Sequence, residues 1–393
     1  MLADTLGNDV PEQWAYDGNN PGFDAPGRGQ LTQISAGASG AVYSESLSYA
    51  ADGDVHSVND SVNGAWTYQY DPMNRLVQAN CGSASGCDGV PNGNGLAFVY
   101  DRFGNLWQQN YVQGGQAGAQ VSFTGENNRM DGYSYNAEGD LLNDGIHQYA
   151  YDAENRLSGV DNGATASYAY FPSGARATKT TGGNTFWYLY DAQGRQLAEL
   201  NASGAWERGE IYAGGRHIAS YANSTTYFDH NDSLNTARVR TGVSGAVSQT
   251  CANWPFGNDL NCSGTGGSPL HFTGQERDQE SGLDNRNFVE IALKKSRARY
   301  DSSNFGRFMT PDWSAAPAAT PYASLANPQS LNLYNYTLNN PVTKVDVKGH
   351  CPICLWLIGG EIAAAVTAYE TYRIEIFNSQ LKSCRFQPRS AKK

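Results

Sequence analysis

Cysteine offers the most reactive chemistry in this chain of 393 residues, which contains seven of them. Cys351 and Cys354 have the C-x-x-C spacing found in redox-active and zinc-binding sites. No second pair and no suitably placed histidine completes a set of metal ligands near them. We therefore expect no metal centre and no cofactor in this protein.

Two further cysteine pairs, Cys81 with Cys87 and Cys251 with Cys262, lie in segments rich in Gly, Ser and Asn. Each pair could close a small loop as a disulfide, which is typical of proteins exported to an oxidising compartment. Free thiols in surface loops are the alternative, and the spacing alone does not decide between the two.

A polar cluster surrounds His230, which stands beside Asp229 and close to Asp232. These residue types could form a metal site or an acid/base pair. A polar turn capped by its own side chains is the commoner arrangement in a chain rich in strands, and we favour it here. We assign His271 no catalytic role either.

Composition narrows the fold and the partners. The chain has 44 Gly and 24 Tyr but only 17% charged residues, which favours turns and strands over long helices. Its formal charge of −11, with no stripe of Lys and Arg in the central part, argues against nucleic acid as a partner of that region.

The elements that must position any functional group are hairpins. Six four-residue turns end in Gly or Asn, residues that tolerate positive φ, and five of the six open with Asp or Asn. The six turns are Asp71–Asn74, Asp101–Gly104, Asn136–Gly139, Asp152–Asn155, Phe171–Gly174 and Asp191–Gly194.

An aromatic-x-aromatic pair precedes every one of these turns. The pairs are Tyr68 and Tyr70, Phe98 and Tyr100, Tyr133 and Tyr135, Tyr149 and Tyr151, Tyr168 and Tyr170, and Tyr188 and Tyr190. Period two predicts strands with one buried and one solvated face. Such short repeats must stack on their neighbours to bury a face, so the chain is predicted to be a strip of hairpins. Another hairpin is expected around Ala213–Arg216.

These motifs resemble the YD repeat of RHS proteins, in which Tyr-Asp is followed by Gly-Arg-Leu. The runs are Tyr70-Asp71 with Arg75-Leu76, Tyr151-Asp152 with Arg156-Leu157, and Tyr190-Asp191 with Gly194-Arg195. Later motifs resemble the RHS-associated core in its usual order. They are Phe272–Asp278, Ala298–Asp301, Gly306–Phe308, Pro311–Asp312, Asn332–Tyr336 with Asn339–Pro341, and Asp346–Gly349.

The resemblance implies an all-β fold, in which antiparallel hairpin repeats spiral into a curved sheet or partial cage closed by a core plug. We expect degenerate repeats over residues 1–60, the hairpin array over 61–225, the RHS core over 226–350 and a short tail over 351–393. Within the core, the interval 285–297 departs from the family pattern. Its apolar positions 288, 291 and 292, followed by basic residues, predict a short helix.

The resemblance also implies the only catalysis expected of this chain, a single-turnover aspartyl autoprotease. Carried over by motif, its two carboxylates are Asp312 and Asp346, and the bond to be cut joins His350 to Cys351. Two close carboxylates share one proton, so that one activates water while the other protonates the carbonyl. Arg299 and Arg307 are assigned structural roles. Val347 stands where the family has Pro, which should loosen the approach of Asp346.

The resemblance predicts a shell fragment of a polymorphic toxin that encloses and releases its own C-terminal segment or effector. It would act as a secreted or envelope-associated bacterial protein, although no signal peptide is visible. Residues 353–369 are largely apolar but short for a bilayer span of about 20 residues, so we expect a buried or amphipathic helix, with membrane contact as the alternative. The rival functions are a surface module that binds a glycan or receptor, and a nonfunctional truncated remnant.

Overall fold

The computed structural model describes residues 2–17, 29–91, 93–113, 117–125, 127–290, 295–312, 328–346 and 355–356. Within these ranges the regular structure is β-strand with five short 3-10 turns, and no α-helix occurs. The all-β prediction is thus confirmed for the described residues. No helix of this part is long and apolar enough to span a bilayer.

The first sheet has ten antiparallel strands in sequence order. They are β1 (Leu2–Thr5), β2 (Pro11–Tyr16), β3 (Leu31–Ala36), β4 (Tyr43–Tyr49), β5 (Val55–Asp60), β6 (Gly64–Tyr70), β7 (Leu76–Cys81), β8 (Gly95–Tyr100), β9 (Leu106–Tyr111) and β10 (Ala117–Gln120). Residues 2–60, where degenerate repeats were expected, supply five of these strands. A two-stranded sheet follows, formed by β11 (Ser134–Tyr135) and β12 (Leu141–Asn143).

The second large sheet has twelve strands, again antiparallel and in sequence order. They are β13 (Tyr149–Tyr151), β14 (Leu157–Val160), β15 (Ala166–Tyr170), β16 (Arg176–Thr181), β17 (Asn184–Tyr190), β18 (Gln196–Asn201), β19 (Trp206–Ala213), β20 (Arg216–Ala222), β21 (Thr225–Asn231), β22 (Ala237–Thr241), β23 (Val247–Ala252) and β24 (Asn261–Gly264). The hairpin array thus runs on past residue 225. We call β1–β24 the wall.

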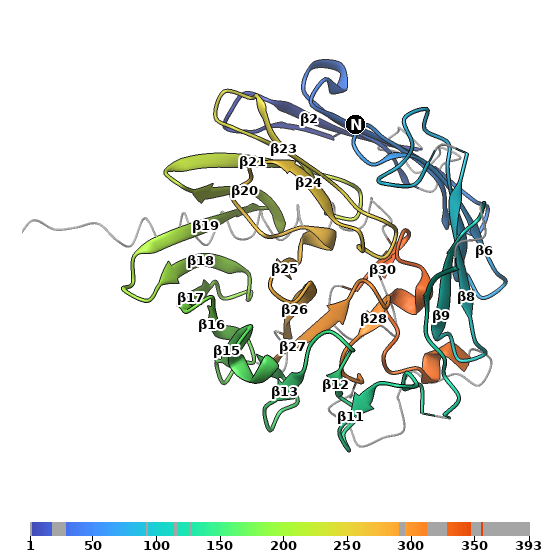
Figure 1. The fold of residues 1–393 in the computed structure, drawn as a ribbon. Helices are drawn as coiled ribbons and strands as arrows, with labels where there is room; N and C mark the ends of the chain where they lie inside the picture. Colours follow the sequence, from blue (N-terminus) through green and yellow to red (C-terminus); the bar gives the residue numbers. More distant parts are fainter. Residues whose placement is uncertain are drawn as a thin grey trace, which may run out of the picture.

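The described residues of 265–346, which we call the plug, lie inside the curve of the wall (Figure 1). The plug contains a four-stranded sheet of β25 (Glu276–Asp278), β26 (Leu283–Glu290), β27 (Lys295–Ser302) and β28 (Arg307–Phe308). Its last strand, β29 (Lys344–Val345), pairs with β30 (Leu355–Trp356). The 3-10 turns are η1 (Ala38–Gly40), η2 (Asp161–Gly163), η3 (Phe272–Gly274), η4 (Pro328–Leu331) and η5 (Thr337–Asn339).

Two helix predictions are wrong where the structure tests them. Residues 285–290 and 295–297 belong to the β26–β27 hairpin, with Phe288 opposite Arg297. Three apolar positions within five residues are too weak a helical pattern to outweigh a continuous antiparallel ladder. Leu355 and Trp356, within the predicted C-terminal helix, form a strand because β29 offers them a free edge. The rest of 353–369 lies outside the described residues.

The predicted turns are confirmed, and in the four that open with Asp its side chain accepts from the N–H two residues on. In the turn that opens at Asp71, the N–H of Asn74 donates to the Asp71 carbonyl at 2.9 Å, and Asn74 has a φ of 58°. The Asp71 side chain accepts from the N–H of Met73 at 2.9 Å. The same carboxylate also pairs with the Arg75 guanidinium at 2.6 Å.

In five of the six repeats the hydroxyl of the second aromatic residue donates to a backbone carbonyl of the preceding hairpin; these residues are Tyr70, Tyr100, Tyr151, Tyr170 and Tyr190. The Tyr100 hydroxyl donates to the carbonyl of Leu76 in the preceding hairpin at 2.7 Å, and Arg75 lies over the Tyr100 ring at 5.0 Å. Tyr170 does the same with Leu157 and Arg156. The Tyr-Asp and Arg-Leu parts of the motif are therefore complementary surfaces of adjacent hairpins, which explains why they recur together.

The first aromatic residue of each pair points inward and packs against the plug. Tyr168 lies 5.5 Å from Tyr300, and Tyr133 lies 5.6 Å from Phe305, measured between ring centroids. Five of these inward residues are buried: Tyr68, Phe98, Tyr149, Tyr168 and Tyr188. On β17 the alternate side chains Trp187 and Leu189 are exposed. The predicted alternation of buried and solvated faces is confirmed there.

The wall closes on itself, because β2 returns to lie beside β21 and β23 (Figure 1). Buried side chains make this contact. The His230 Nδ1 lies 2.7 Å from the Glu12 Oε1, and the Asn8 amide donates to the Thr241 hydroxyl at 2.8 Å. A curved strip of this length is therefore long enough to complete one turn, joined by side chains across the seam.

Candidate functional site

The two carboxylates predicted as catalytic meet at one guanidinium. Asp312 follows Pro311, and its N–H donates to the Leu333 carbonyl at 2.7 Å. Asp346 directly follows β29. Each Oδ2 lies 3.8 Å from the Arg299 Nη2, so these two oxygens are at most twice that distance apart. The fold thus brings together two residues that are far apart in sequence.

Burial and aromatic packing define the surroundings of this pair. Asp312 and Asp346 are 7% and 2% exposed. Arg299 lies on β27, and its guanidinium carbon sits 3.5 Å from the centroid of the Phe308 ring, which fixes its position. A separation of 3.8 Å is longer than a hydrogen bond, so these two contacts are ionic neighbours and not a bidentate clamp.

The predicted bond, between His350 and Cys351, lies outside the described residues, as does the C-x-x-C motif. Its place along the chain is nevertheless bounded. Val345 is paired with Leu355 in the β29–β30 ladder, so the bond belongs to the connection that starts at Asp346 and returns to the same sheet. One of the two candidate carboxylates therefore stands at the start of the connection that contains the bond.

Arg307 has the structural role expected of it. Its guanidinium donates to the Asn128 carbonyl at 2.6 Å and stacks over Tyr334 at 4.5 Å. Burial lowers the pKa of Arg307 from its usual value. The residue joins the plug to the wall near the end of the first sheet.

The polar cluster around His230 does not form a metal site, because its members point to different partners. His230 lies in β21, fully buried, with Nε2 2.9 Å from the Thr241 hydroxyl. Asp232 caps the following turn by accepting from the N–H groups of Leu234 and Thr236, at 2.9 and 2.8 Å. The preferred turn interpretation is therefore right for Asp232, whereas His230 belongs to the wall seam.

Asp229 forms a buried pair with His217. The His217 Nδ1 lies 2.7 Å from Asp229, and its Nε2 lies 2.6 Å from Glu210. Burial alone would lower the pKa of His217, but the two carboxylates raise it to about 9. Burial alone would raise the pKa of Asp229, but Arg240 and His217 bring it well below its usual range. This imidazolium has a structural role between β20 and β21.

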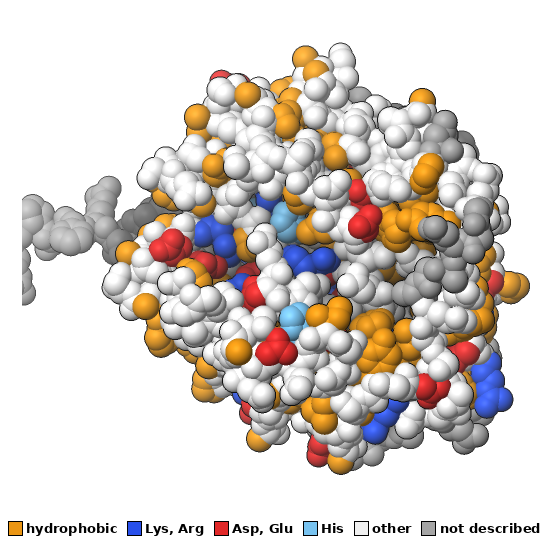
Figure 2. Space-filling view, viewed as in Figure 1, with side chains coloured by type: hydrophobic (Ala, Val, Ile, Leu, Met, Phe, Trp, Pro, Cys, Tyr) orange, Lys and Arg blue, Asp and Glu red, His pale blue; other side chains and the backbone are white. Residues whose placement is uncertain are grey.

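Sequence reasoning missed a buried ionic cluster that holds the plug to the wall. Arg176, on β16, lies 2.6 Å from Glu276 and 2.7 Å from Asp278, both on β25. Lys179 approaches the same two carboxylates at 3.3 and 2.9 Å. Figure 2 shows charged side chains and imidazoles gathered in the hollow at the centre of the face that it views. The charged Glu276-Arg277-Asp278 run was the only available signal.

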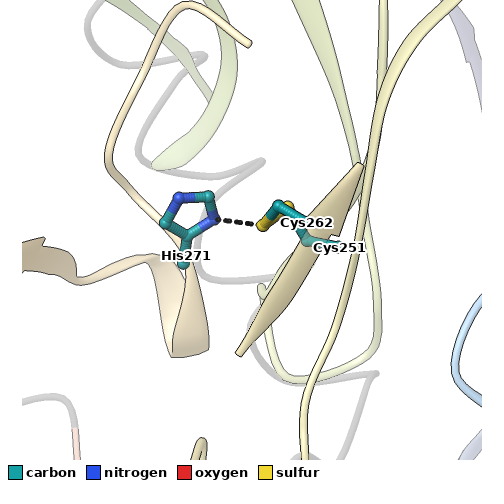
Figure 3. A group of neighbouring side chains, drawn as sticks. All are labelled: Cys251, Cys262 and His271. Carbon is teal, nitrogen blue, oxygen red and sulfur yellow. Dashed lines mark hydrogen bonds between the residues drawn. A yellow bond between two sulfur atoms is a disulfide. The ribbon is translucent and has the colours of Figure 1, made fainter. Parts of the chain in front are cut away.

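Sequence reasoning also missed the approach of His271 to the second cysteine pair. Both pairs, Cys81–Cys87 and Cys251–Cys262, are disulfides. The His271 Nδ1 faces Cys262 at 4.0 Å from its sulfur (Figure 3). Burial, followed by the charges of Arg240 and Arg277, lowers the pKa of His271 to about 3.

The wall consists of tandem antiparallel hairpins and closes around an internal plug. Contacts between the Tyr-Asp and Arg-Leu parts of the motif join neighbouring hairpins, and this architecture is that of a YD-repeat shell. The family model called Teneurin YD-shell matches residues 22–342, which is more than half of the chain. The chain therefore belongs to the Teneurin YD-shell family, and the resemblance to RHS and YD-repeat proteins is confirmed.

Two curated relatives are bacterial proteins of much greater length. The tRNA3(Ser)-specific nuclease WapA of Bacillus spizizenii is 26% identical over 298 residues, which cover 72% of this chain and 12% of that protein. The tRNA nuclease WapA of Bacillus subtilis is 25% identical over 298 residues, with the same coverage. The chain thus spans about an eighth of the relatives that it matches.

Solved structures of toxin complexes share the fold. The crystal structure of TcdB2-TccC3-Cdc42 superposes with a TM-score of 0.66 at 19% identity, covering 89% of this chain and 19% of that chain. The Photorhabdus luminescens Tc holotoxin pore, with a TccC3 variant, gives 0.65 at 18% identity, covering 89% and 18%. At these identities the likeness shows the fold alone.

Proposed function

We propose that this chain is part of the shell of a bacterial polymorphic toxin and that it releases the segment after His350 by cutting its own backbone. The meeting of Asp312 and Asp346 at Arg299, inside the plug, is the observation that carries this proposal. A base held beside a bond of its own chain gains the effective concentration of an intramolecular reaction, worth up to ~7–11 kcal/mol of the barrier. Modest catalysts therefore suffice for one turnover.

Water attack fits the chemistry of this pair. One carboxylate takes a proton from water, the oxygen of that water forms a bond to the carbonyl carbon of His350, and the other carboxylic acid protonates the carbonyl oxygen. Collapse of this intermediate breaks the C–N bond and passes a proton to the departing amine of Cys351. The products are a C-terminal carboxylate at His350 and a new N-terminus at Cys351.

The space inside the shell bears on what it could enclose. A cavity of about 510 Å³ lies between the wall and the plug, lined by residues that include Tyr111, Tyr133, Trp254 and Phe305. This is the volume of a small-molecule pocket and not of a folded domain. We therefore propose that the chain contributes one turn of wall and the plug to a larger enclosure, whose content is the chain's own C-terminal segment or effector.

Export to an oxidising compartment is part of the same proposal. The two disulfides stabilise the wall at Cys81–Cys87 and Cys251–Cys262. Disulfides persist in secreted and envelope-associated proteins and are rare in a reducing cytosol. We therefore place the mature protein outside the bacterial cytoplasm.

Mass spectrometry of the purified chain tests the cut. We expect a fragment that ends at His350, and we expect Asp312→Asn and Asp346→Asn each to leave the chain intact. Asp152→Asn, in a surface turn of the wall, is the matched control and should cut as the unchanged chain does. A single intact mass for the unchanged, folded chain would reject the proposal, as would cleavage that persists in both core variants.

A second function, glycan binding, is favoured by an exposed aromatic surface on the outer face of β17–β20. Trp187, Trp206 and Tyr221 are 47%, 55% and 43% exposed. Residues paired directly across an antiparallel ladder point to the same face of the sheet. One row of such pairs runs across the four strands through Leu189, Ala198, Gly209 and Tyr221, so Tyr221 lies on the same face as the exposed Leu189. The Trp206 ring covers Gly209, where an added Cβ would lie 2.6 Å from it.

Flat, exposed aromatic rings of this kind stack on sugar rings. Binding to an oligosaccharide array should be lost in the Trp187→Ala, Trp206→Ala double variant. It should be kept when the exposed Val243 and Val247 are changed to Ala. Equal binding by both variants would exclude this surface as the glycan site.

A further inference from the structure

We propose that the chain, once its second disulfide is reduced, binds one Zn²⁺ ion through Cys251, Cys262 and His271. The three side chains come from β23, β24 and the residue before η3 (Figure 3). Their ligand atoms, two sulfurs and an imidazole nitrogen, all lie within 4.8 Å of one another. Zinc prefers this combination of thiolate sulfur, a soft donor, and imidazole nitrogen, a borderline donor.

The geometry needs little backbone movement. Zinc holds sulfur at about 2.3 Å and nitrogen at about 2.0–2.1 Å, so tetrahedral ligands stand roughly 3.5–3.8 Å apart. The Cys262 sulfur and the His271 Nδ1, at 4.0 Å, are already close to that separation. The two sulfurs must part from bonding distance, and rotation of each cysteine side chain achieves this while Cys251 and Cys262 stay paired in the ladder.

The surroundings of the three side chains determine the fourth ligand of the zinc ion and the negative charge that its ligands must carry. His271 lines a cavity of about 340 Å³ together with Gln249 and Ser268, and we expect a water molecule from this side to be the fourth ligand. Arg240 and Arg277 place positive charge near His271. A divalent ion is tolerated beside them because two thiolates balance its charge, a condition that neutral donors alone would not meet.

The chemistry balances as thiol–disulfide exchange followed by metal binding. Two molecules of a monothiol such as glutathione break the Cys251–Cys262 bond, and they are oxidised to their own disulfide while the two cysteine sulfurs take up the thiol protons. Zinc then displaces those two protons and forms two Zn–S bonds and one Zn–N bond.

Replacing the disulfide by a zinc ion would change which elements are linked to β24, the last strand of the wall. The disulfide joins β23 to β24, both within the wall. Zinc would add His271, which leads through η3 into β25 of the plug. The oxidised protein therefore links wall to wall at this point, whereas the reduced and metal-bound protein links wall to plug.

A cobalt titration tests the proposal, because Co²⁺ occupies zinc sites and reports thiolate ligation by a charge-transfer band. The parent protein is the full chain with Cys351, Cys354 and Cys384 changed to Ser. It is reduced with a water-soluble phosphine, which becomes the phosphine oxide with oxygen taken from water. We expect one Co²⁺ per chain, displaced by one Zn²⁺, and no band from the same protein kept oxidised.

Two variants of the parent locate the site. Cys251→Ser with Cys262→Ser should abolish the band, and His271→Ala should weaken binding by at least ~100-fold. Cys81→Ser with Cys87→Ser is the matched control and should bind as the parent does. No band in the reduced parent overturns the proposal, and so does a band lost only in the Cys81 and Cys87 control. The oxidised and reduced samples share one sequence, so this comparison holds even if a variant fails to fold.

Discussion

Replacing Arg176 by Met should detach the plug from the wall more than any comparable change at the surface. The Arg176 side chain is fully buried and lies within 2.6 and 2.7 Å of two carboxylates that are themselves nearly inaccessible. Met keeps much of the volume and removes the charge. Among the described cationic side chains, Glu276 and Asp278 would then keep Lys179 at short range, and Glu276 would keep Arg208 at 3.8 Å.

The expected cost is about 3–5 kcal/mol of unfolding free energy, the usual penalty for breaking a buried ion pair from one side. Arg195→Met is the matched control. Arg195 pairs with Asp191 in a wall turn and stacks over Tyr212, but its side chain is 30% exposed. We expect this control to cost about 1–2 kcal/mol.

The pH dependence separates the ionic effect from lost packing. In the unchanged protein burial opposes ionisation of Glu276, but Arg176, Lys179 and Arg208 hold its pKa well below the usual range. That contribution to stability is present above about pH 4.5 and is lost as the pH falls. Without Arg176 the carboxylates should take up protons more readily, so the deficit of the variant should shrink on acidification.

The measurement is urea unfolding followed by tryptophan fluorescence, repeated between about pH 3 and 8 so that the range includes the acid side of the usual Glu pKa. A deficit for Arg176→Met no larger than that of Arg195→Met would refute the reasoning. A deficit that stays constant over this pH range would show that packing, and not charge, sets the cost.

The remaining predictions concern the wall. Since Asp229 and Glu210 raise the pKa of His217 to about 9, its stabilising charge is fully present below about pH 6.5 and is lost as the pH rises to 9. In the unchanged protein this loss should lower the unfolding free energy by ~3 kcal/mol between these pH values, and His217→Gln should remove it. Parallel pH profiles for the variant and the unchanged protein would contradict this prediction. Tyr100→Phe removes a donor to the Leu76 carbonyl and should cost ~1 kcal/mol in the same assay. The control Tyr221→Phe, on the exposed outer face, should cost less than ~0.5 kcal/mol. If both variants lose the same unfolding free energy, the Tyr100 hydroxyl does not stabilise the contact between neighbouring hairpins.

Local chemistry explains why the hairpins were predictable. Asp at the first turn position caps the turn with its own carboxylate, and Asn or Gly at the fourth position takes the positive φ that the turn requires. Both effects act within five residues, so a single sequence reveals them. The alternation of aromatic residues likewise marked the face that packs on the plug, as Tyr168 and Tyr188 show.

The candidate carboxylates came from motif resemblance, and the structure adds their common neighbour. Nothing in the spacing of Asp312 and Asp346 says that Arg299 lies between them, because the three come from separate parts of the plug. The approach of His271 to the Cys251–Cys262 pair was hidden for the same reason. Each meeting brings together side chains from separate segments of the chain, which spacing along the sequence does not reveal.

The sequence by itself determined the repeating unit: the turns, the strand alternation and the stitching residues all follow from short-range hydrogen bonding and periodic burial. Tertiary structure decided whether the strip closes, which segment lies inside it, and that residues 285–290 and 295–297 form a hairpin ladder. Those outcomes depend on contacts between residues far apart in the chain, such as Glu12 with His230 and Arg176 with Asp278. Curvature accumulates over many strands, so no single repeat contains the information that the wall meets itself after one turn.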